Sequence, residues 1–423
     1  MTRHPRRRVT VVLGLGFGDE GKGSIVDWLA RTAPTPPIVV RWNGGPQAMH
    51  HVVTDDGRSH CFAQLGAGSF VPGARTHLGP DMAIDPYALH GEAAALATAG
   101  VPAALATLTI DPRCLVITPW HAILNRVREL VRGDARHGST GRGVAEARFA
   151  RIAIRAGQLG PDLAAATDEL RGALAADVAD LLARHPDPPE AARALGARVG
   201  ARDLVDAFLD AAAGLAPAGV SITPAVPAGD DVILEGAHGA LLDQDHGFFP
   251  HVTPSRITRA AAEAAMLALE LDGPAEIWGV LRAYQTRHGA GPLPSYDPTL
   301  TARLVEAHNP NDGWSGGFRV GWFDGVLARH ALAFAGPVDR LALTCVDRAA
   351  MLDPIHVVDA WQTPDGRVTD LATIAADRRT PIAARATAIV RPVVSIAPAV
   401  AELLGRAVDL ESWGPTAGAK RRA

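Results

Sequence analysis

A glycine-rich segment near the N-terminus, GLGFGDEGKGS at residues 14–24, constrains the fold of this chain more than any other feature. It directly follows an apolar, β-branched run at residues 9–13, and a helical pattern begins at Lys22. A strand, a glycine loop and a helix in this order form a phosphate site, because helix N-terminal N–H groups attract anions and glycines let a phosphate approach the backbone. We therefore predict that this segment binds the phosphates of a nucleotide.

The segment departs from the usual P-loop pattern in two ways. Gly23 stands where a Ser or Thr is expected, and the hydroxyl comes one place later, at Ser24. An acidic pair, Asp19 and Glu20, also lies in the middle of the loop. A carboxylate beside phosphates is expected where it binds Mg²⁺ or takes a proton from the substrate. Asp19 is therefore a candidate catalytic residue.

Short, continuously apolar runs alternate with helical patterns along the chain. The predicted strands cover residues 9–13, 38–41, 232–234, 277–281, 341–344 and 355–358. The predicted helices cover residues 22–31, 86–99, 161–184, 188–215, 259–271 and 325–335. This alternation predicts an α/β fold with a large central, mostly parallel β-sheet flanked by helices. We expect one domain over residues 1–423, with the Ala-rich residues 161–215 as a helical insertion.

Composition excludes several classes of protein. The net charge of −4 gives no general attraction to a nucleic-acid polymer. No segment reaches the roughly eighteen apolar residues that a membrane helix needs. The three cysteines are far apart and odd in number, so no disulfide framework is predicted and a reducing compartment is expected. These observations predict a cytoplasmic protein that does not bind membranes.

The loop and seven later segments resemble, in order, the motifs of the adenylosuccinate synthetase family. GFGDEGKGSIVD at residues 16–27 is similar to the family signature QWGDEGKGKIVD. The later segments are RWNGGPQAMHH (41–51), GSTGRGV (138–144), LEGAHGALLDQDHGFFPHVT (234–253), RAYQTRHGAGPLP (282–294), GWFDGVLARHA (321–331), LTCVD (343–347) and SWGP (412–415). Because the matches span most of the chain, it is identified as a member of this family.

The resemblance implies a P-loop-like fold, a homodimer and a ligase that uses Mg²⁺ and GTP. In the family, the 6-oxygen of IMP is first phosphorylated, and the amino group of L-aspartate then displaces the phosphate. A purine N1–H must lose its proton before the 6-oxygen becomes nucleophilic, which explains a carboxylate at the phosphate loop. The resemblance implies that Asp19 is this base, that His50 is the general acid and that Lys22 assists at the phosphates.

The resemblance also implies binding residues. Asp19 and the backbone carbonyl of Met49 match the Mg²⁺ ligands. The positions that match GTP contacts are Gly18, Glu20, Gly21, Gly23, Ser24, Asp347, Ser412 and Gly414. The positions that match contacts to the purine nucleotide and the amine are Gln47, Ser139, Thr140, Arg155, His238, Thr253, His288 and Arg319. Arg155 matches, within one residue, an arginine that reaches the nucleotide of the partner subunit.

The sequence departs from the family at the aspartate loop. The family pattern V-A-T-T-G-R-R-R-R-T-G-W corresponds here to NDGWSGGFRVGW, which keeps only Arg319 of the arginine row. The other three arginines are replaced by Gly316, Gly317 and Phe318, and the paired threonines by Gly313 and Trp314. Binding a dicarboxylate requires fixed cationic donors. One interpretation is that another arginine compensates, or that the alignment slips. The other is that the amine donor is not aspartate, or that aspartate is held quite differently, and we favour this one.

The nucleotide positions also depart from the family. Gln47 replaces an Asn, His238 a Gln, His288 a Val and Pro46 a His, so the acceptor is either IMP or a modified nucleotide. Cys345 replaces a lysine that packs on guanine, which weakens the preference for GTP over other triphosphates, although Asp347 favours GTP. Three hypotheses remain: the IMP–aspartate reaction, a specialised paralogue with another nucleotide or amine, and a non-catalytic nucleotide-binding regulator.

Overall fold

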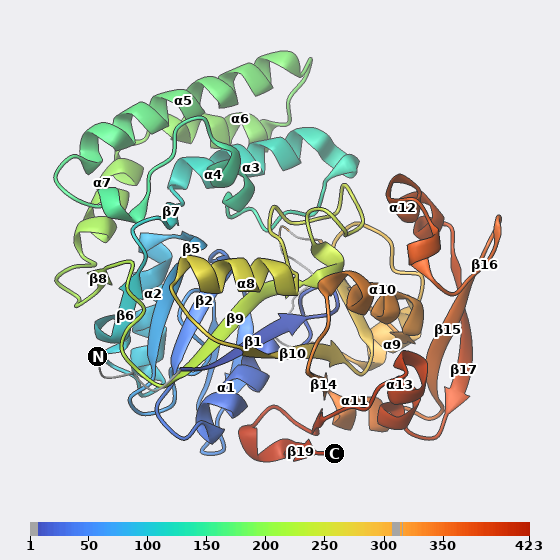
Figure 1. Ribbon diagram of the computed structural model, residues 1–423. Helices are drawn as coiled ribbons and strands as arrows, with labels where there is room; N and C mark the ends of the chain where they lie inside the picture. Colours follow the sequence, from blue (N-terminus) through green and yellow to red (C-terminus); the bar gives the residue numbers. More distant parts are fainter. Residues whose placement is uncertain (1–6, 307–313, 315) are drawn as a thin grey trace.

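The computed structural model describes residues 7–306, 314 and 316–423, and its centre is a large β-sheet (Figure 1). Strand β1 (Arg8–Gly14) lies between β9 (Asp231–Gly239) and β10 (Ala275–Arg282), and it is parallel to both. Strand β2 (Ile38–Gly44) continues the parallel sheet beyond β9, and β14 (Arg340–Thr344) continues it beyond β10. The predicted mostly parallel central sheet is confirmed.

Shorter strands complete the two edges of this sheet. They are β5 (Arg75–Ile84), β6 (Leu108–Ile110), β7 (Leu115–Val116), β8 (Ser221–Ile222), β18 (Leu410–Ser412) and β19 (Lys420–Arg422). Among the strand pairs described for this sheet, only β18 and β19 are antiparallel. Because the central strands point the same way, their carboxyl ends and the loops that follow lie at one edge, where ligands bind in such sheets.

The run predicted as a strand at residues 355–358 is a strand, but it belongs to a second sheet. This sheet contains β13 (Phe323–Asp324), β15 (Ile355–Thr363), β16 (Gly366–Val368) and β17 (Thr387–Val393). Two further sheets have two antiparallel strands each: β3 (His50–Val53) with β4 (Ser59–Phe62), and β11 (Gln285–His288) with β12 (Phe318–Gly321).

Four predicted helices outside the insertion are confirmed, with ends shifted by up to three residues: α1 (Lys22–Thr32), α2 (Pro86–Thr98), α8 (Arg259–Ala268) and α10 (Gly325–Ala335). The helices that sequence patterns missed are α3 (Pro119–Arg132), α4 (Val144–Phe149), α9 (Pro298–Arg303), α11 (Val346–Ala350), α12 (Ala376–Ala384) and α13 (Ile396–Leu404). None of the helices in the described part of the chain combines the length and apolar character needed to cross a membrane.

The Ala-rich insertion is helical, as predicted, and its helices lie together at the upper left of Figure 1. It consists of α5 (Leu163–Arg184), α6 (Glu190–Ala197) and α7 (Arg202–Ala213). The single helix expected at 188–215 is wrong, because a 3₁₀ turn at Arg198–Gly200 separates α6 from α7. Helices α5 and α6 pack on α3, and α7 packs on α2. Its buried leucines share one apolar core with strand residues such as Leu78 and Met82.

Candidate active site

The phosphate loop (residues 14–24) is folded around the side chain of Glu20. Glu20 Oε1 accepts hydrogen bonds from the backbone N–H groups of Gly16 at 2.9 Å and Gly18 at 2.6 Å. The side chain is 3% exposed, and a Cβ on Gly16 would lie only 2.8 Å from Oε1. Glu20 therefore shapes the loop from within, a role different from the direct GTP contact that the family motif implies.

Lys22 is also turned inward in this conformation. Its Nζ donates to Glu20 Oε2 at 2.7 Å and to the Gly18 carbonyl at 2.9 Å, and its side chain is fully buried. The N-cap of α1 is Gly21, at φ 82°, and no side chain caps this end of the helix. The first N–H groups of a helix have no partner within it, so they attract an anion. The groups of this segment that could attract a phosphate are therefore the backbone N–H groups at the start of α1 and the buried ammonium group of Lys22.

Asp19 lies at the border between the loop and a cavity. Its backbone carbonyl accepts from Arg282 Nη1 at 3.0 Å, and its carboxylate Oδ2 lies 3.4 Å from His288 Nε2. Burial raises the pKa of Asp19, whereas the nearby charges of His288 and Arg282 lower it. A carboxylate that is partly desolvated yet keeps cationic neighbours is suited to accept a proton.

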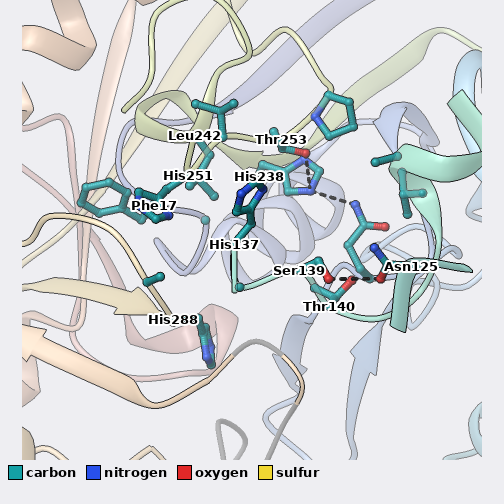
Figure 2. A pocket seen from close by; sticks show the side chains of 18 of the residues that line it. Phe17, Asn125, His137, Ser139, Thr140, His238, Leu242, His251, Thr253 and His288 are labelled. Atoms are coloured by element: carbon teal, nitrogen blue, oxygen red, sulfur yellow. Dashed lines mark hydrogen bonds between the residues drawn. The ribbon is translucent and has the colours of Figure 1, made fainter. Parts of the chain in front are cut away.

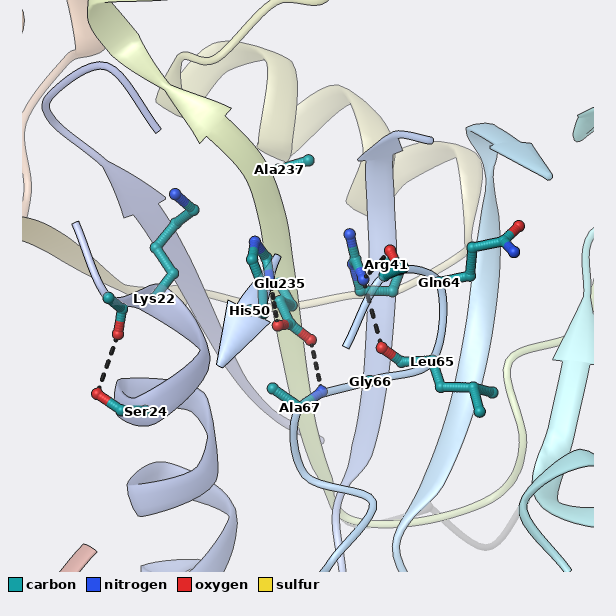
Figure 3. Close-up of polar contacts among 12 residues, drawn as sticks. Lys22, Ser24, Arg41, His50, Gln64, Leu65, Gly66, Ala67, Glu235 and Ala237 are labelled. Atoms are coloured by element: carbon teal, nitrogen blue, oxygen red, sulfur yellow. Dashed lines mark hydrogen bonds and ion pairs between the residues drawn. The ribbon is translucent and has the colours of Figure 1, made fainter. Parts of the chain in front are cut away.

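His50 begins β3 and makes a very short contact, through Nδ1, with Glu235 Oε1 of strand β9 (Figure 3). The second carboxylate oxygen of Glu235 accepts from the backbone N–H of Ala67 at 2.9 Å. Both side chains are buried, and burial lowers the pKa of His50 against the opposing effect of Glu235. Buried Arg41, whose Nη1 donates to the Ala63 carbonyl at 2.9 Å, lies beside them. The contact with Glu235 leaves Nε2 of His50 for a substrate.

A cavity of about 490 Å³ brings the predicted residues together. Its lining comes from residues 17–19, 47–50, 125–146, 238–254 and 287–290. Asp19, Met49 and His50 line it, as do Gln47, Ser139, Thr140, His238, Thr253 and His288. Figure 2 shows His288 and Phe17 on one side of the cavity and Asn125 on the other. Two motifs that are far apart in sequence, the phosphate loop and the segment around His50, thus meet at one cavity.

We call one group of the cavity-lining residues the recognition wall: Gln47, Asn125, Ser139, Thr140, Glu146, His238 and Thr253. Gln47 Nε2 lies 2.8 Å from His238 Nε2, and Thr253 Oγ1 lies 3.4 Å from the same nitrogen. Ser139 Oγ donates to Asn125 Oδ1 at 3.1 Å (Figure 2). Burial lowers the pKa of His238 to about 3, so its ring is neutral at ordinary pH.

Sequence patterns missed Asn125, Arg128, Glu129 and Arg132, which helix α3 places on the cavity. The signal for this helix was present, because Thr118 is its N-cap and Pro119 its first residue. Glu129 holds the loop that carries Ser139: its Oε2 accepts from the backbone N–H groups of Gly138 at 3.0 Å and Ser139 at 3.3 Å.

Several predicted residues do not line this cavity. Ser24 is half-buried, and its hydroxyl donates to the Gly21 carbonyl at 3.1 Å. Arg155 is exposed and donates to the Arg113 carbonyl at 2.7 Å. Arg319 donates through Nη2 to the carbonyls of Gly289 at 2.6 Å and Gly291 at 2.8 Å.

The positions matched to guanine lie near the C-terminus, outside the cavity. Asp347 is in the first turn of α11, and Ser412 Oγ donates to the Gly414 carbonyl at 2.9 Å. Lys420 Nζ donates to the same Gly414 carbonyl at 3.0 Å, and burial lowers the pKa of Lys420 to about 8. Asp347 contributes to the negative charge around this ammonium group.

In the segment matched to the aspartate loop, Gly313 lies outside the described residues. Trp314 is described, and the guanidinium groups of Arg126 and Arg136 lie over its ring at 5.4 and 5.8 Å from the centroid. Phe318 packs against the His288 ring at 4.8 Å between centroids.

Comparisons with known proteins agree on one family. A family model described as adenylosuccinate synthetase matches residues 11–395. The adenylosuccinate synthetase of Neisseria meningitidis serogroup C is 32% identical over 380 residues, which cover 87% of this chain and 83% of the relative. That of Vibrio cholerae serotype O1 is 33% identical over 377 residues, with the same coverage.

Two solved structures share the fold. The fully ligated adenylosuccinate synthetase of Plasmodium falciparum superposes with a TM-score of 0.74 at 20% identity, covering 99% of this chain and all of that one. The succinoaminodeoxyadenylate synthetase of cyanophage S-2L, bound to dGMP and dATP, superposes with a TM-score of 0.54 at 17% identity, covering 99% of this chain and 96% of that one.

Proposed function

Because this chain belongs to the adenylosuccinate synthetase family, we propose that it is a ligase that uses GTP and Mg²⁺ to form a C–N bond on a purine nucleotide. The observation that carries this proposal is that Asp19 and His50, from separate motifs, line the same cavity. In the first step, an amide-like N–H of the base loses its proton and the oxo group takes the γ-phosphoryl group. In the second step, an amine attacks the ring carbon that carries the phosphorylated oxygen, a C–N bond forms, and phosphate leaves with that oxygen.

Asp19 is the group that accepts the proton from the base. Its carboxylate lines the cavity, and the bond from Arg282 Nη1 to its backbone carbonyl fixes its position. His50 is the group that stabilises charge on the 6-oxygen and the phosphoryl group. The Glu235 carboxylate orients its ring. The negative charge of Glu235 stabilises the imidazolium form of His50 and so opposes the lowering of the His50 pKa by burial.

The residues fit a Mg²⁺ ion that is bound mainly by substrate. Mg²⁺ usually takes one or two carboxylates plus substrate phosphates, and its preferred ligands are oxygens. The Asp19 carboxylate and the Met49 carbonyl would supply such oxygens at the cavity. Within the described ranges, no group of three or more His, Cys, Asp or Glu side chains is arranged to hold a metal without substrate. When bound, Mg²⁺ neutralises negative charge on the triphosphate.

We further propose that the amine is not aspartate, or that aspartate is held differently from the family pattern. Arg319 is the arginine kept from the family row, and its Nη2 donates to two backbone carbonyls, those of Gly289 and Gly291. Phe318 packs on His288, where the family pattern has an arginine and a valine. The Gln47–His238 pair supports an acceptor nucleotide that differs from IMP or binds in another way.

The assembly and location are also proposals. Arg155 is exposed and away from its own cavity, which fits an arginine that reaches the nucleotide of a partner subunit in a homodimer. The three cysteines are free, which supports a reducing, cytoplasmic compartment.

A phosphate-release assay across a panel tests the proposal. The panel crosses IMP and other 6-oxopurine nucleotides with aspartate and other amines, and GTP with ATP. We expect release that depends on all three substrates and on Mg²⁺. Robust turnover with IMP, aspartate and GTP would support the ligase and contradict a different amine, leaving only the version in which aspartate is held differently. Nucleotide binding without turnover for any combination would favour a non-catalytic regulator.

A further inference from the structure

Two arginine–glutamate pairs lie along the part of the cavity formed by α3 and α4. Arg132 Nη1 donates to Glu129 Oε1 at 2.6 Å, and Arg128 Nη1 donates to Glu146 Oε1 at 3.2 Å. Both glutamates are buried, with side chains 0% and 4% exposed, whereas both arginines are more than a third exposed. All four side chains line the cavity. The two pairs therefore share the same chemistry and the same surroundings.

The pairs differ in how completely the carboxylate is satisfied. Glu129 uses both oxygens, because Oε2 takes the two backbone N–H groups of Gly138 and Ser139. Glu146 Oε2 is buried and has no hydrogen-bond partner among the residues that the structure describes. A buried carboxylate oxygen without a donor is destabilising, because it has lost water and gained nothing in exchange. The missing donor is therefore expected to come from a molecule in the cavity.

We propose that Glu146 is a specificity residue for the acceptor nucleotide and accepts a hydrogen bond from a hydroxyl or amino group of its sugar or base. This inference rests on the proposed function. An ionised carboxylate can accept hydrogen bonds but cannot donate them, so its partner must be a donor. It also repels phosphate, so it contacts the nucleotide away from the phosphate group. Acidic side chains bind ribose hydroxyls in this way in other nucleotide sites.

Calorimetric binding of three nucleotides to Glu146→Gln and to the wild type tests the inference. The probes are IMP, 2′-deoxy-IMP, which lacks one sugar hydroxyl, and GMP, which adds an amino group to the base. We expect the variant to bind at least one of them about tenfold or more weakly, because a hydrogen bond to a charged acceptor is lost. A penalty for IMP that vanishes for 2′-deoxy-IMP assigns the donor to the 2′-hydroxyl, and a penalty seen with GMP alone assigns it to the amino group.

Thermal unfolding without ligand separates this role from a structural one. If Glu146 only supported the fold, the variant would melt at a lower temperature. We expect its melting temperature to be unchanged or higher, because the buried oxygen without a donor is replaced by an uncharged group. Glu169→Gln, at an exposed position of α5, is the matched control.

Equal affinities of Glu146→Gln and wild type for all three nucleotides would overturn the inference while leaving the ligase proposal in place. A lower melting temperature together with equal affinities would assign Glu146 to the fold. Failure of the wild type to bind any of the three would overturn this inference, and the phosphate-release panel would then decide separately whether the ligase proposal holds.

Discussion

The phosphate loop and the recognition wall adjoin the same cavity but are held together over very different distances along the chain. In the loop, Glu20 contacts Gly16, Gly18 and Lys22, which are at most four residues away. In the wall, Gln47 contacts His238, 191 residues away. The side-chain bonds inside the loop are thus specified by a short motif, although Arg282 also binds the Asp19 carbonyl from 263 residues away. The Gln47–His238 contact exists only once the sheet has formed.

This difference coincides with where the sequence departs from its family. The loop keeps Asp19, Glu20 and Lys22 of the family signature, and it carries the start of the proposed reaction. The wall carries Gln47 and His238 in place of the family's Asn and Gln, and these two replacements contact each other. The two replaced positions are therefore neighbours in the folded wall.

The largest expected effect comes from removing Asp19, the proposed proton acceptor in the phosphate loop. Asp19→Ala should lower phosphate release by about a hundredfold to ten-thousandfold, because the proton acceptor is lost. The release assay with the best substrate set measures this, and Asp187→Ala, whose side chain is 94% exposed in the insertion, is the control. Turnover within tenfold of the wild type would remove Asp19 from the mechanism.

The second effect concerns the stability of the loop. Glu20→Ala should lower the free energy of unfolding by about 3–5 kcal/mol, because it leaves the buried Lys22 ammonium without its partner. Urea denaturation measures the loss. The double variant Glu20→Gln with Lys22→Met should recover much of it, since no unpaired charge remains. Equal stability of Glu20→Ala and wild type would show that the loop does not depend on this pair.

A third effect belongs to the wall and depends on pH. Burial lowers the pKa of His238 to about 3, below the 6.5 of a free histidine, so the unfolded chain binds a proton between these values and the folded chain does not. Stability therefore falls as pH drops below about 6.5, by up to about 2 kcal/mol at pH 5. Urea denaturation at pH 7.5 and 5 should show that His238→Gln loses less stability than the wild type. Parallel losses would mean that His238 is protonated in the folded protein.

The smallest effect is expected at the late hydroxyl of the loop. Ser24→Ala should change the KM for GTP by no more than about twofold, because this hydroxyl bonds the Gly21 carbonyl and does not line the cavity. Steady-state kinetics measure it. A tenfold rise in KM would restore Ser24 as a phosphate contact and make the loop more like an ordinary P-loop.

Local patterns in the sequence predicted the elements that local forces determine. The strand at residues 9–13, the glycine loop and helix α1 are present as expected, because apolar runs and helix-start signals act over a few residues. Helix α3 was missed although Thr118 and Pro119 mark its start. Helix α4 was missed as well. The two omissions left Glu129 of α3 and Glu146 of α4 out of the predicted site, because their surroundings depend on how these helices lie on the cavity.

Side-chain partners that are distant in sequence could not be predicted. Nothing near His50 indicates that Glu235 would hold its ring. Nothing near His288 indicates that Asp19 would lie 3.4 Å away. Lys22 shows the opposite limit: the motif places it correctly at the loop, but only the folded structure shows that its ammonium group is buried against Glu20.

The internal carboxylate of Glu20 has a consequence for substitutions in the wall. Because the bonds of Glu20 to Gly16, Gly18 and Lys22 lie within the phosphate loop, the side chains of Gln47, His238 and Glu146 can be exchanged without breaking any of them. Substitutions at these three wall positions can therefore change which substrate is bound while the side-chain bonds that shape the loop stay the same.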